Sequence, residues 1–467
     1  MGPLSLPFKC EVLIPESGQS PKDVIHRWSD SFLDLPAMIV KPKCEEDIVD
    51  ALVFAKQKNL TVTTTNGGRA PFVVITTKTL YLDMGNFNQV SVNTSSNTVR
   101  VGGGASTEEV IASTTAEGYY TLWPNSDAVG YVGCLLGGGS DTMNGLHGFM
   151  VDAVESMRVI TGEGIKLEVS PSSTGQERNL FNALCGAGFG LAIVTSVNMK
   201  AFSIASLHLT NDCIWTRRVT LPSTAVDVAT QVFSSIRTLP PPLHLTMVCI
   251  RAPPSSPSPG SPLIIITANY FGPSHEGEKA TSFLYEPELL DRALKADTEL
   301  VPFALANAPL KPLSANHGYK GFSSTFLQTI DSQTIQVAIE KWIELGNEYR
   351  DAYPTTLIFN KWNSEAIDRN GQEEAGNAKF FEHRGFKMMA FSMRWCMNET
   401  TRQVLDNFGD EFLRIVRRNE QGPYHCMANN QRPGMNLEEL FSKKRLEDLK
   451  HVKSTWDPDH VLWSPYH

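Results

Sequence analysis

Four clusters of glycine between residues 67 and 190 constrain the fold of this chain more than any other feature. They are Gly67-Gly68, Gly102-Gly103-Gly104, Gly137-Gly138-Gly139, and the alternating Gly186, Gly188 and Gly190. Each lies beside a short apolar run, and glycine at a junction between a strand and a helix lets backbone N–H groups approach a phosphate closely. Glycine also serves any tight turn with a positive φ angle. The clusters therefore leave two interpretations open, a phosphate-binding surface or a series of turns.

The common phosphate-binding and hydrolytic motifs are absent from the sequence. No G-x-x-x-x-G-K-[ST] run occurs, and the run that begins at Gly186 lacks the last glycine of G-x-G-x-x-G because that position is Leu191. H-E-x-x-H and G-x-S-x-G are also missing. The sequence thus supports neither a P-loop NTPase nor a standard Rossmann enzyme, and neither a zinc protease of that type nor an α/β-hydrolase.

Apolar periodicity in the first 200 residues alternates between strand and helix. Residues 37–40 and 60–65 have the apolar, β-branched composition of strands. Residues 45–58 between them repeat apolar side chains every three to four positions, as an amphipathic helix does. The opening is therefore a β-α-β unit. The elements predicted to follow it are strands at 73–82, 90–92 and 98–101 and a helix at 107–117 with Thr107 as its N-cap.

The pattern changes near Phe202, where glycine becomes rarer and the elements become longer. Helices are predicted at 225–236, 335–349 and 437–454, and strands at 245–251, 263–270, 355–359 and 386–395. A Pro/Ser loop at 253–260 cannot pair in a sheet. The predicted fold class is α+β, with a glycine-rich unit first and an antiparallel sheet flanked by helices after it.

Charge and composition narrow the class of partner. The chain has 41 Lys and Arg against 50 Asp and Glu, a formal charge of −9, which argues against a nucleic acid or an anionic membrane as partner. No apolar run approaches the roughly 20 residues of a membrane-spanning helix. Residues 1–22 lack the continuous apolar core of a secretory signal, so a cytoplasmic location is the default expectation. Eight scattered cysteines without a Cys-x-x-Cys pair indicate reduced thiols and no metal site.

Several segments share their order and spacing with one known family. They are Pro36 to Pro42, the loop Asn66-Gly67-Gly68-Arg69-Ala70, Val129-Gly130 with Gly133 and Gly137-Gly138-Gly139, Leu184-Cys185-Gly186-Ala187-Gly188 with Ile193-Val194-Thr195, and the tail with Trp456-Asp457-Pro458 and Val461-Leu462-Trp463. On these segments the chain resembles the FAD-linked oxidoreductases of the vanillyl-alcohol-oxidase and berberine-bridge-enzyme-like family. Their FAD-binding domain is of the PCMH type, and the resemblance extends to members that tailor natural products.

The resemblance implies a two-part fold with FAD as the cofactor. Residues 1–202, completed by residues 423–467, would form the FAD-binding domain, and residues 203–422 a substrate-binding domain whose antiparallel sheet covers the flavin ring. It also implies an oxidase-type oxidoreductase that acts on a small, apolar, natural-product-like molecule. The residues that it assigns to FAD are Asn66, Gly67, Gly68, Arg69, Ala70, Ser126, Gly130, Gly133, Gly137, Gly138, Gly139, Val194 and Asn429.

Two positions depart from the family pattern and bear on how FAD is held. Many members attach the flavin through a His in the first glycine loop, and some also through a Cys in the second; this chain has Arg69 and Ser126 there. A guanidinium stays protonated and cannot attack the flavin, and a serine hydroxyl is a far weaker nucleophile than a thiolate. We therefore expect non-covalent FAD. Arg69 would lie near the pyrophosphate or the ring, or remain a solvated loop cation.

The catalytic group is less well defined by the sequence. The family's Tyr-x-Asn element falls on Met427-Ala428-Asn429, so its tyrosine is missing. His425 and Tyr424 then become the candidate catalytic residues, because an imidazole suits general base catalysis. The candidate substrate-pocket residues, which mix aromatic and polar groups, are His317, Tyr319, Asn360, Trp362, Arg394 and Met427.

A second function remains open at this point. Because the attachment residues and the tyrosine are gone, the same scaffold would also suit a redox-silent cyclase or isomerase of the pericyclase type. Such an enzyme accelerates an intramolecular reaction by holding its substrate in a reactive conformation. Substrate turnover that consumes oxygen or bleaches the flavin would distinguish the oxidoreductase from this alternative.

Overall fold

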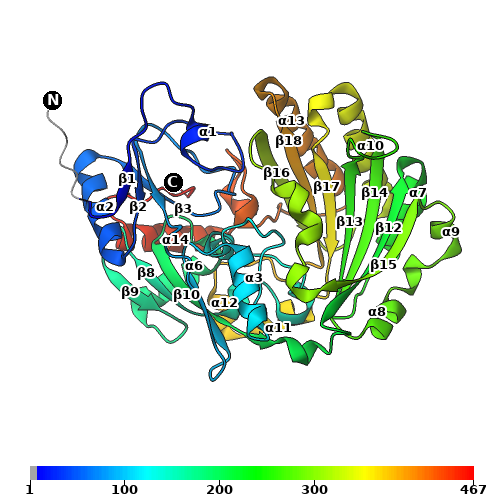
Figure 1. Ribbon diagram of the computed structural model, residues 1–467, viewed down its shortest axis with the longest axis horizontal. Helices are drawn as coiled ribbons and strands as arrows, with labels where there is room; N and C mark the ends of the chain where they lie inside the picture. Colours follow the sequence, from blue (N-terminus) through cyan, green and yellow to red (C-terminus); the bar gives the residue numbers. More distant parts are fainter. Residues whose placement is uncertain (1–7, 467) are drawn as a thin grey trace.

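The computed structural model describes residues 8–466, which form two halves that lie side by side (Figure 1). The first half holds two small sheets, and the C-terminal helix, drawn in red in Figure 1, returns to it. The second half is built on one seven-stranded sheet. The expectation about a secretory signal in residues 1–22 lies partly outside the described residues.

The first sheet has four strands and a crossover helix. Its strand order is β1 (Glu11–Leu13), β2 (Met38–Lys41), β4 (Thr79–Asp83) and β3 (Thr61–Thr65). β2, β4 and β3 run parallel, whereas β1 pairs antiparallel with β2. Helix α2 (Glu45–Lys58) joins β2 to β3 and buries Ile48 and Leu52 in one apolar cluster with Val40 and Leu82. This crossover is what permits neighbouring strands to run parallel.

The second sheet is antiparallel and lies below the first in the view of Figure 1. Its order is β5 (Val90–Asn93), β6 (Thr98–Gly102), β10 (Ile193–Lys200), β8 (Val154–Ile160) and β9 (Lys166–Val169). Val101, Met157 and Val197 of this sheet are fully or almost fully buried. The helices of this half are α1 (Pro21–Val24), α3 (Thr107–Ala116), α4 (Tyr131–Leu136), α5 (Asn144–His147) and α6 (Gly175–Ala187), and a short ladder pairs β7 (Tyr119–Tyr120) with β11 (Phe202–Ser203).

The C-terminal tail is bonded into the first half. Helix α14 (Lys443–Trp456) packs against α6, and the chain then runs alongside β3. The N–H of Val62 donates to the carbonyl of Val461, and the N–H of Trp463 donates to the carbonyl of Val62. Through this short parallel bridge, the tail pairs with β3 at the edge of the first sheet. The domain limits at residues 202 and 423 stay a prediction.

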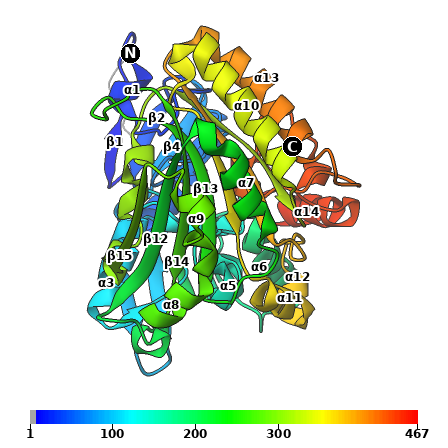
Figure 2. The ribbon, with the colours of Figure 1, turned by 90° about the vertical axis from the view of Figure 1, so that its right-hand side faces the viewer.

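The seven-stranded sheet is antiparallel throughout. Its order is β15 (Lys295–Pro302), β12 (Cys213–Pro222), β14 (Pro262–Tyr270), β13 (Leu243–Arg251), β17 (Thr356–Lys361), β18 (Met388–Cys396) and β16 (Tyr319–Leu327). Helices α7 (Val226–Ser235), α10 (Ser332–Glu348) and α13 (Glu399–Val416) lie along one face (Figure 2). The opposite face is turned toward the first half. Two shorter helices complete this half, α8 (Ser274–Ala280) and α9 (Pro287–Leu290). Helices α11 (Glu365–Gln372) and α12 (Glu374–Ala378) lie beneath the first half, where α11 contacts α5 (Figure 1).

The predicted α+β class is confirmed, with local differences. The predicted strand at 73–82 is shorter, since β4 covers only Thr79–Asp83, and the final helix begins at Lys443. The N-cap of α3 is Ser106 rather than Thr107, because the Ser106 hydroxyl accepts a hydrogen bond from the Glu109 N–H. Within residues 8–466, no helix is long and apolar enough to cross a bilayer, and no group of three acidic, His or Cys side chains is arranged for a metal ion.

Candidate active site between the two halves

A cavity of about 290 Å³, here called the glycine-lined cavity, lies in the first half and reaches the second. Its walls come from residues 62–70, from Gly130 and the start of α4, and from residues 189–194. Asn429, Leu462 and Trp463 close it from the C-terminal region, and Phe322 of β16 closes it from the seven-stranded sheet. Segments far apart in the sequence therefore meet in one site.

The glycines of this cavity are required by close backbone contacts. A Cβ atom on Gly67 would lie 2.5 Å from the N atom of Gly130, and one on Gly103 would lie 2.1 Å from the carbonyl oxygen of Val194. Gly68 has a φ of +61°, which side chains rarely permit. By contrast, a Cβ on Gly133 would meet no protein atom within 4 Å. The glycines thus allow the backbone segments of the walls to approach one another closely, and the space beside Gly133 is free of protein atoms.

The loop at residues 66–70 presents free backbone donors. Within residues 8–466, the N–H groups of Gly67, Gly68 and Arg69 donate to no other protein atom. Gly68 lies in the left-handed region, and successive free N–H groups in such a turn are of the kind that binds anions. This loop therefore fits a phosphate-bearing ligand.

Two arginines add unpaired positive charge to the same walls. The guanidinium of Arg27, almost fully buried, donates to the carbonyl of Ala70 at 2.6 Å, and burial lowers the pKa of Arg27. Arg69 donates to the carbonyl of Ala128 at 3.3 Å, and burial lowers its pKa to about 10. Among the described residues, neither arginine has an acidic side chain within ion-pair distance. Arg27 is buried and Arg69 is half-buried, and cations that lack a counter-charge in such surroundings favour an anionic ligand.

These features fit FAD, which carries a diphosphate and a planar ring system. The free amides and the two arginines would hold the diphosphate, and the apolar side chains of the cavity, Phe72, Val194 and Trp463 among them, would contact the ring. Arg27 was not found from the sequence. It lies before the first glycine loop with no motif around it, and only the fold brings it behind residues 66–70.

Nine of the residues predicted for FAD line this cavity: Asn66, Gly67, Gly68, Arg69, Ala70, Gly130, Gly133, Val194 and Asn429. The other four lie behind its walls. Gly137, Gly138 and Gly139 pack against Asn429, Phe381 and Met150, and the N–H of Gly139 donates to the Asn429 side chain at 3.2 Å. The Ser126 hydroxyl lies 2.7 Å from that of Ser314. The third glycine cluster therefore positions Asn429 rather than facing the cavity.

The two candidate catalytic residues lie outside this cavity. The His425 ring packs against His383 and Phe386, with ring centroids 4.9 and 5.0 Å away, and burial lowers its pKa. The Tyr424 ring lies against the guanidinium of Arg417 at 4.4 Å. The structure therefore gives neither side chain a place in the cavity wall, and their catalytic role stays a prediction.

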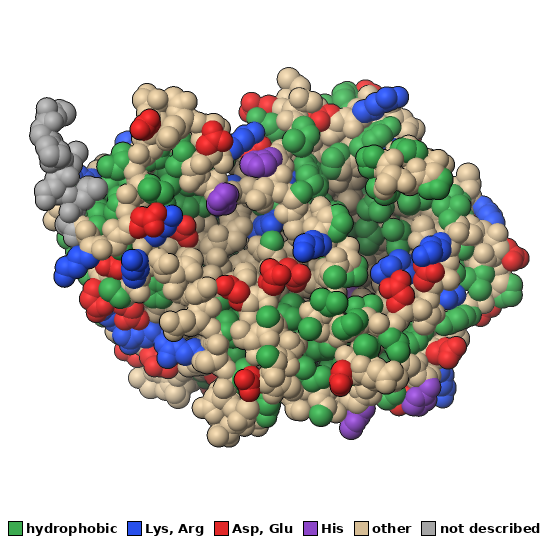
Figure 3. All heavy atoms as spheres, in the orientation of Figure 1, with side chains coloured by type: hydrophobic (Ala, Val, Ile, Leu, Met, Phe, Trp, Pro, Cys, Tyr) green, Lys and Arg blue, Asp and Glu red, His purple; other side chains and the backbone are tan. Residues whose placement is uncertain are grey.

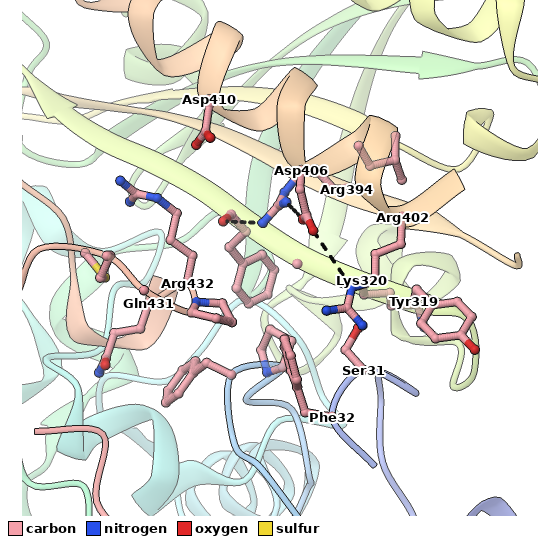
Figure 4. A pocket seen from close by; sticks show the side chains of 18 of the residues that line it. Ser31, Phe32, Tyr319, Lys320, Arg394, Arg402, Asp406, Asp410, Gln431 and Arg432 are labelled. Atoms are coloured by element: carbon pink, nitrogen blue, oxygen red, sulfur yellow. Dashed lines mark hydrogen bonds and ion pairs between the residues drawn. The ribbon is translucent and has the colours of Figure 1, made fainter. Parts of the chain in front are cut away.

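A second cavity of about 350 Å³, here called the polar cavity, adjoins the first (Figure 4). It lies between residues 31–32 and 71–72, the start of β16, helix α13 and residues 431–436. Phe72 and Phe322 line both cavities. Arg394 is bonded to Asp406, and Arg432 lies 2.9 Å from Glu439. Most acidic groups of the polar cavity are therefore engaged by arginines.

The six candidate substrate residues are not all brought together. Tyr319 and Arg394 line the polar cavity. Asn360 lies on the side of the seven-stranded sheet that faces the first half, where it accepts a hydrogen bond from Thr246 at 3.0 Å. His317 is exposed and lies 3.7 Å from Asp30. Trp362 and Met427 are buried in the core, Trp362 bonded to the carbonyl of Phe386 and Met427 packed near Gly138.

The face of the seven-stranded sheet opposite its helices is partly open. Leu245, Met247 and Cys249 of β13 are buried under the helices, so by alternation Thr246, Val248 and Ile250 point the other way. The same alternation places five half-buried apolar side chains on this open face: Val248, Ile250, Ile265, Ile358 and Phe391. Figure 3 shows hydrophobic side chains gathered in a hollow over these strands. The sheet thus offers an apolar surface beside the two cavities.

Comparisons with known proteins agree with this site. A family profile described as FAD binding domain matches residues 36–170. The FAD-linked oxidoreductase azaL of Aspergillus niger is 30% identical over 424 residues, which cover 88% of this chain and 85% of azaL. The FAD-linked oxidoreductase srdI of Neurospora crassa is 23% identical over 94% of this chain and 86% of its own length.

Solved structures share the fold. The 6-hydroxy-D-nicotine oxidase of Arthrobacter nicotinovorans superposes with a TM-score of 0.80 at 15% identity, over 100% of this chain and 99% of that one. Berberine bridge enzyme of Eschscholzia californica gives 0.77 at 15% identity, over 98% and 96%. The α+β fold class with a PCMH-type architecture, expected from the resemblance, is thereby confirmed. The chain shares its fold with berberine bridge enzyme, and it belongs to the family of FAD-linked oxidoreductases.

Proposed function

We propose that the protein holds FAD without a covalent bond and oxidises a small, largely apolar, natural-product-like molecule that carries a few polar groups. One observation carries the first part: the side chain at the family's attachment position is a guanidinium, that of Arg69, and it lines the glycine-lined cavity. Among the described residues that line this cavity there is no His or Tyr. Its one thiol is that of Cys134, and desolvation in the cavity wall raises the pKa of Cys134 to about 12 and keeps the thiol protonated.

The residues of this chain bind and orient, whereas the cofactor supplies the redox chemistry. Bound FAD would accept a hydride from the substrate. The free N–H groups of residues 67–69, with Arg27 and Arg69, would neutralise the diphosphate. Phe322, which lines both cavities, separates the FAD site from the polar cavity and helps to exclude water.

The open face of the seven-stranded sheet supports the substrate class. Its half-buried side chains, Val248, Ile265, Ile358 and Phe391, are apolar, while Thr246 and Asn360 add polar groups that would orient a ligand. The relatives are named oxidoreductases, which favours oxidation over the redox-silent cyclase. No described residue gives that alternative separate support.

The visible spectrum of the purified protein, read before and after acid precipitation, tests the flavin state. We expect flavin bands that move wholly into the supernatant, because no nucleophile in the cavity can form the link. Flavin that stays with the precipitate would contradict the proposal. A protein that remains colourless after incubation with FAD would contradict cofactor binding itself.

Two variants at residue 69 test the part played by its charge. Arg69→Ala should lower the FAD content and raise the FAD dissociation constant about tenfold or more, as the loss of a charge-assisted contact does. The matched control is Arg100→Ala, on an exposed position of β6 outside the cavity, which should leave FAD content unchanged. Equal FAD content in Arg69→Ala and the wild type would show that Arg69 is only a solvated loop cation.

A further inference from the structure

Lys320 is a buried lysine at the junction of the two cavities. It is the second residue of the edge strand β16, lines the polar cavity and is only 3% exposed. Two positions further along the strand, Phe322 lines both cavities. Figure 4 places Lys320 beside Tyr319, at the opposite end of the polar cavity from Gln431 and Arg432.

The amine of Lys320 is held by neutral groups. Nζ donates to the carbonyl of Trp28 at 2.8 Å and to the carbonyl of Ala315 at 2.5 Å. It also lies 4.0 Å from the ring centroid of Trp395 and 4.9 Å from that of Trp28. Among the described residues, no carboxylate lies within ion-pair distance of this amine. Two carbonyls and two ring faces fix the position of the nitrogen.

Burial, with a smaller contribution from one neighbouring cation, favours the neutral form of the amine. Burial and then the neighbouring Arg69 lower the pKa of Lys320 to about 7, while Asp30 opposes them. Asp30 is itself engaged, since it lies 2.7 Å from Lys22, accepts from the N–H of Gly318 and faces His317 at 3.7 Å. A large fraction of the Lys320 amine is therefore uncharged near neutral pH.

We propose that Lys320 is the proton acceptor for a hydroxyl-bearing substrate, a phenol or an alcohol, that binds where the polar cavity meets the glycine-lined cavity. This inference rests on the FAD-dependent oxidation proposed above. A neutral amine has two N–H bonds and one lone pair. The carbonyls of Trp28 and Ala315 accept both N–H bonds, so the lone pair is left for a ligand.

The step is a simple proton transfer. The O–H bond of the substrate breaks, its proton forms the third N–H bond on Nζ, and its electron pair stays on the oxygen. The ammonium that results lies over the faces of Trp28 and Trp395, which stabilise a cation. The oxygen, now negatively charged, makes the molecule easier to oxidise, and the adjacent ammonium of Lys320 stabilises it.

Other candidate bases are less suited to this role. Asp406 and Glu439 of the polar cavity are paired with Arg394 and Arg432. His425 lies outside both cavities. Asp410, the third carboxylate of the polar cavity, lies close enough to Arg394 to oppose the lowering of the pKa of that guanidinium by burial. Lys320 combines a cavity position with a free lone pair.

Binding of 4-nitrophenolate to the FAD-loaded protein tests proton acceptance without the natural substrate. If Lys320 must be protonated to hold the phenolate, binding takes up one proton, and the dissociation constant rises about tenfold per pH unit between about pH 7.5 and about pH 9. The dissociation constant is measured from the change in the nitrophenolate and flavin spectra. In Lys320→Arg, which keeps the charge but cannot lose its proton, binding should be independent of pH.

Two further variants complete the design. Lys320→Met should bind 4-nitrophenolate at least tenfold more weakly at pH 7.5, where the spectrum of its bound FAD serves as the check on folding. Lys361→Met is the matched control. Lys361 is also buried, its Nζ donates to the carbonyls of Phe233 and Ile236 at 2.7 Å, and burial lowers its pKa to about 8, but it faces the helix side of the sheet. This control should behave as the wild type.

The outcomes separate the two proposals. Wild-type protein without flavin bands would overturn the proposal that FAD is bound, but not the proposal that Lys320 accepts a proton. Flavin-bound protein that fails to bind 4-nitrophenolate, or that binds it equally well at every pH, would overturn the role of Lys320. Equal pH dependence of 4-nitrophenolate binding in Lys320→Met and in the wild type would also overturn the role of Lys320.

Discussion

A buried ion pair in the C-terminal tail should control both stability and FAD binding. Lys453 Nζ lies 2.5 Å from Asp457 and also donates to the carbonyls of Gly190 at 2.7 Å and Leu462 at 3.0 Å. Asp457 is fully buried and accepts from the N–H groups of Val461 and Leu462. Because Gly190 and Leu462 line the glycine-lined cavity, the pair holds two of its walls together.

Asp457→Asn keeps the volume of the side chain and removes its charge, so that Lys453 has no counter-charge. Breaking a buried pair in this way costs about 3–5 kcal/mol. At about 2 °C per kcal/mol for a large domain, the melting temperature should fall by about 6–10 °C. Burial already lowers the pKa of Lys453, and Asp457 opposes that effect, so the variant should also shift Lys453 toward its neutral form.

Thermal unfolding followed by circular dichroism, with and without FAD, measures the effect. The matched control is Asp459→Asn, which removes an exposed carboxylate 3.1 Å from Lys56 on the same tail and should cost less than about 1 kcal/mol. The double variant Lys453→Met with Asp457→Asn should lose less stability than the sum of the two single variants, since no unpaired charge remains. A melting temperature within about 1 °C of the wild type for Asp457→Asn would refute the reasoning.

Three further predictions follow from single residues. Gly133→Ala should leave the fold intact, since its Cβ meets no protein atom, yet weaken FAD binding several-fold in a fluorescence titration, whereas Gly103→Ala should reduce soluble protein because its Cβ would overlap a carbonyl. Burial lowers the pKa of His383 from 6.5 to about 4 in the folded chain. As the pH falls, the unfolded chain therefore takes up a proton at this residue at a higher pH than the folded chain does. The free energy of unfolding should therefore fall as the pH drops from about 6.5 to about 4, less steeply in His383→Gln, by urea titration. Arg384→Met leaves the buried Asp152 unpaired and should cost about 3–5 kcal/mol in the same assay, while an unchanged midpoint would contradict this.

The sequence predicted the elements whose pattern is local. Helix α2 spans residues 45–58, as expected, because its apolar spacing and its acidic first turn agree with one another. The Pro/Ser segment at 253–260 is a loop between β13 and β14, again as expected. In each case neighbouring residues carry enough information for the element to be assigned.

Elements without a clear alternation were missed. β15 has six exposed residues among its eight, so no apolar side shows in its sequence. β16 contains Gly321 and three consecutive small polar residues, Ser323, Ser324 and Thr325, that are buried only because β18 and α13 cover them. Strand pairing, which depends on partners far away in the sequence, supplies what the local pattern lacks.

The site shows the same division between local and distant information. The glycine loops could be assigned because their residues are contiguous, and nine of thirteen line the cavity. Arg27 and Lys320 could not be found, since an isolated cation in a sequence reads as a surface residue. Lys320 is buried by partners that include the carbonyl of Trp28, 292 residues earlier, and only the fold shows that it has no counter-charge.

The coupling between Arg69 and Lys320 links the two proposals in a measurable way. The chain carries a formal charge of −9, yet these two basic side chains, neither of which has a carboxylate partner among the described residues, lie close enough for Arg69 to lower the pKa of Lys320. An anion that pairs with Arg69 cancels this effect and raises the pKa of Lys320. If the FAD diphosphate is that anion, the pH at which 4-nitrophenolate binding begins to weaken should lie higher in the FAD-loaded protein than in the apoprotein. If the neutral ring lies beside Arg69 instead, the two forms should weaken at the same pH, and the comparison tells which part of FAD this arginine holds.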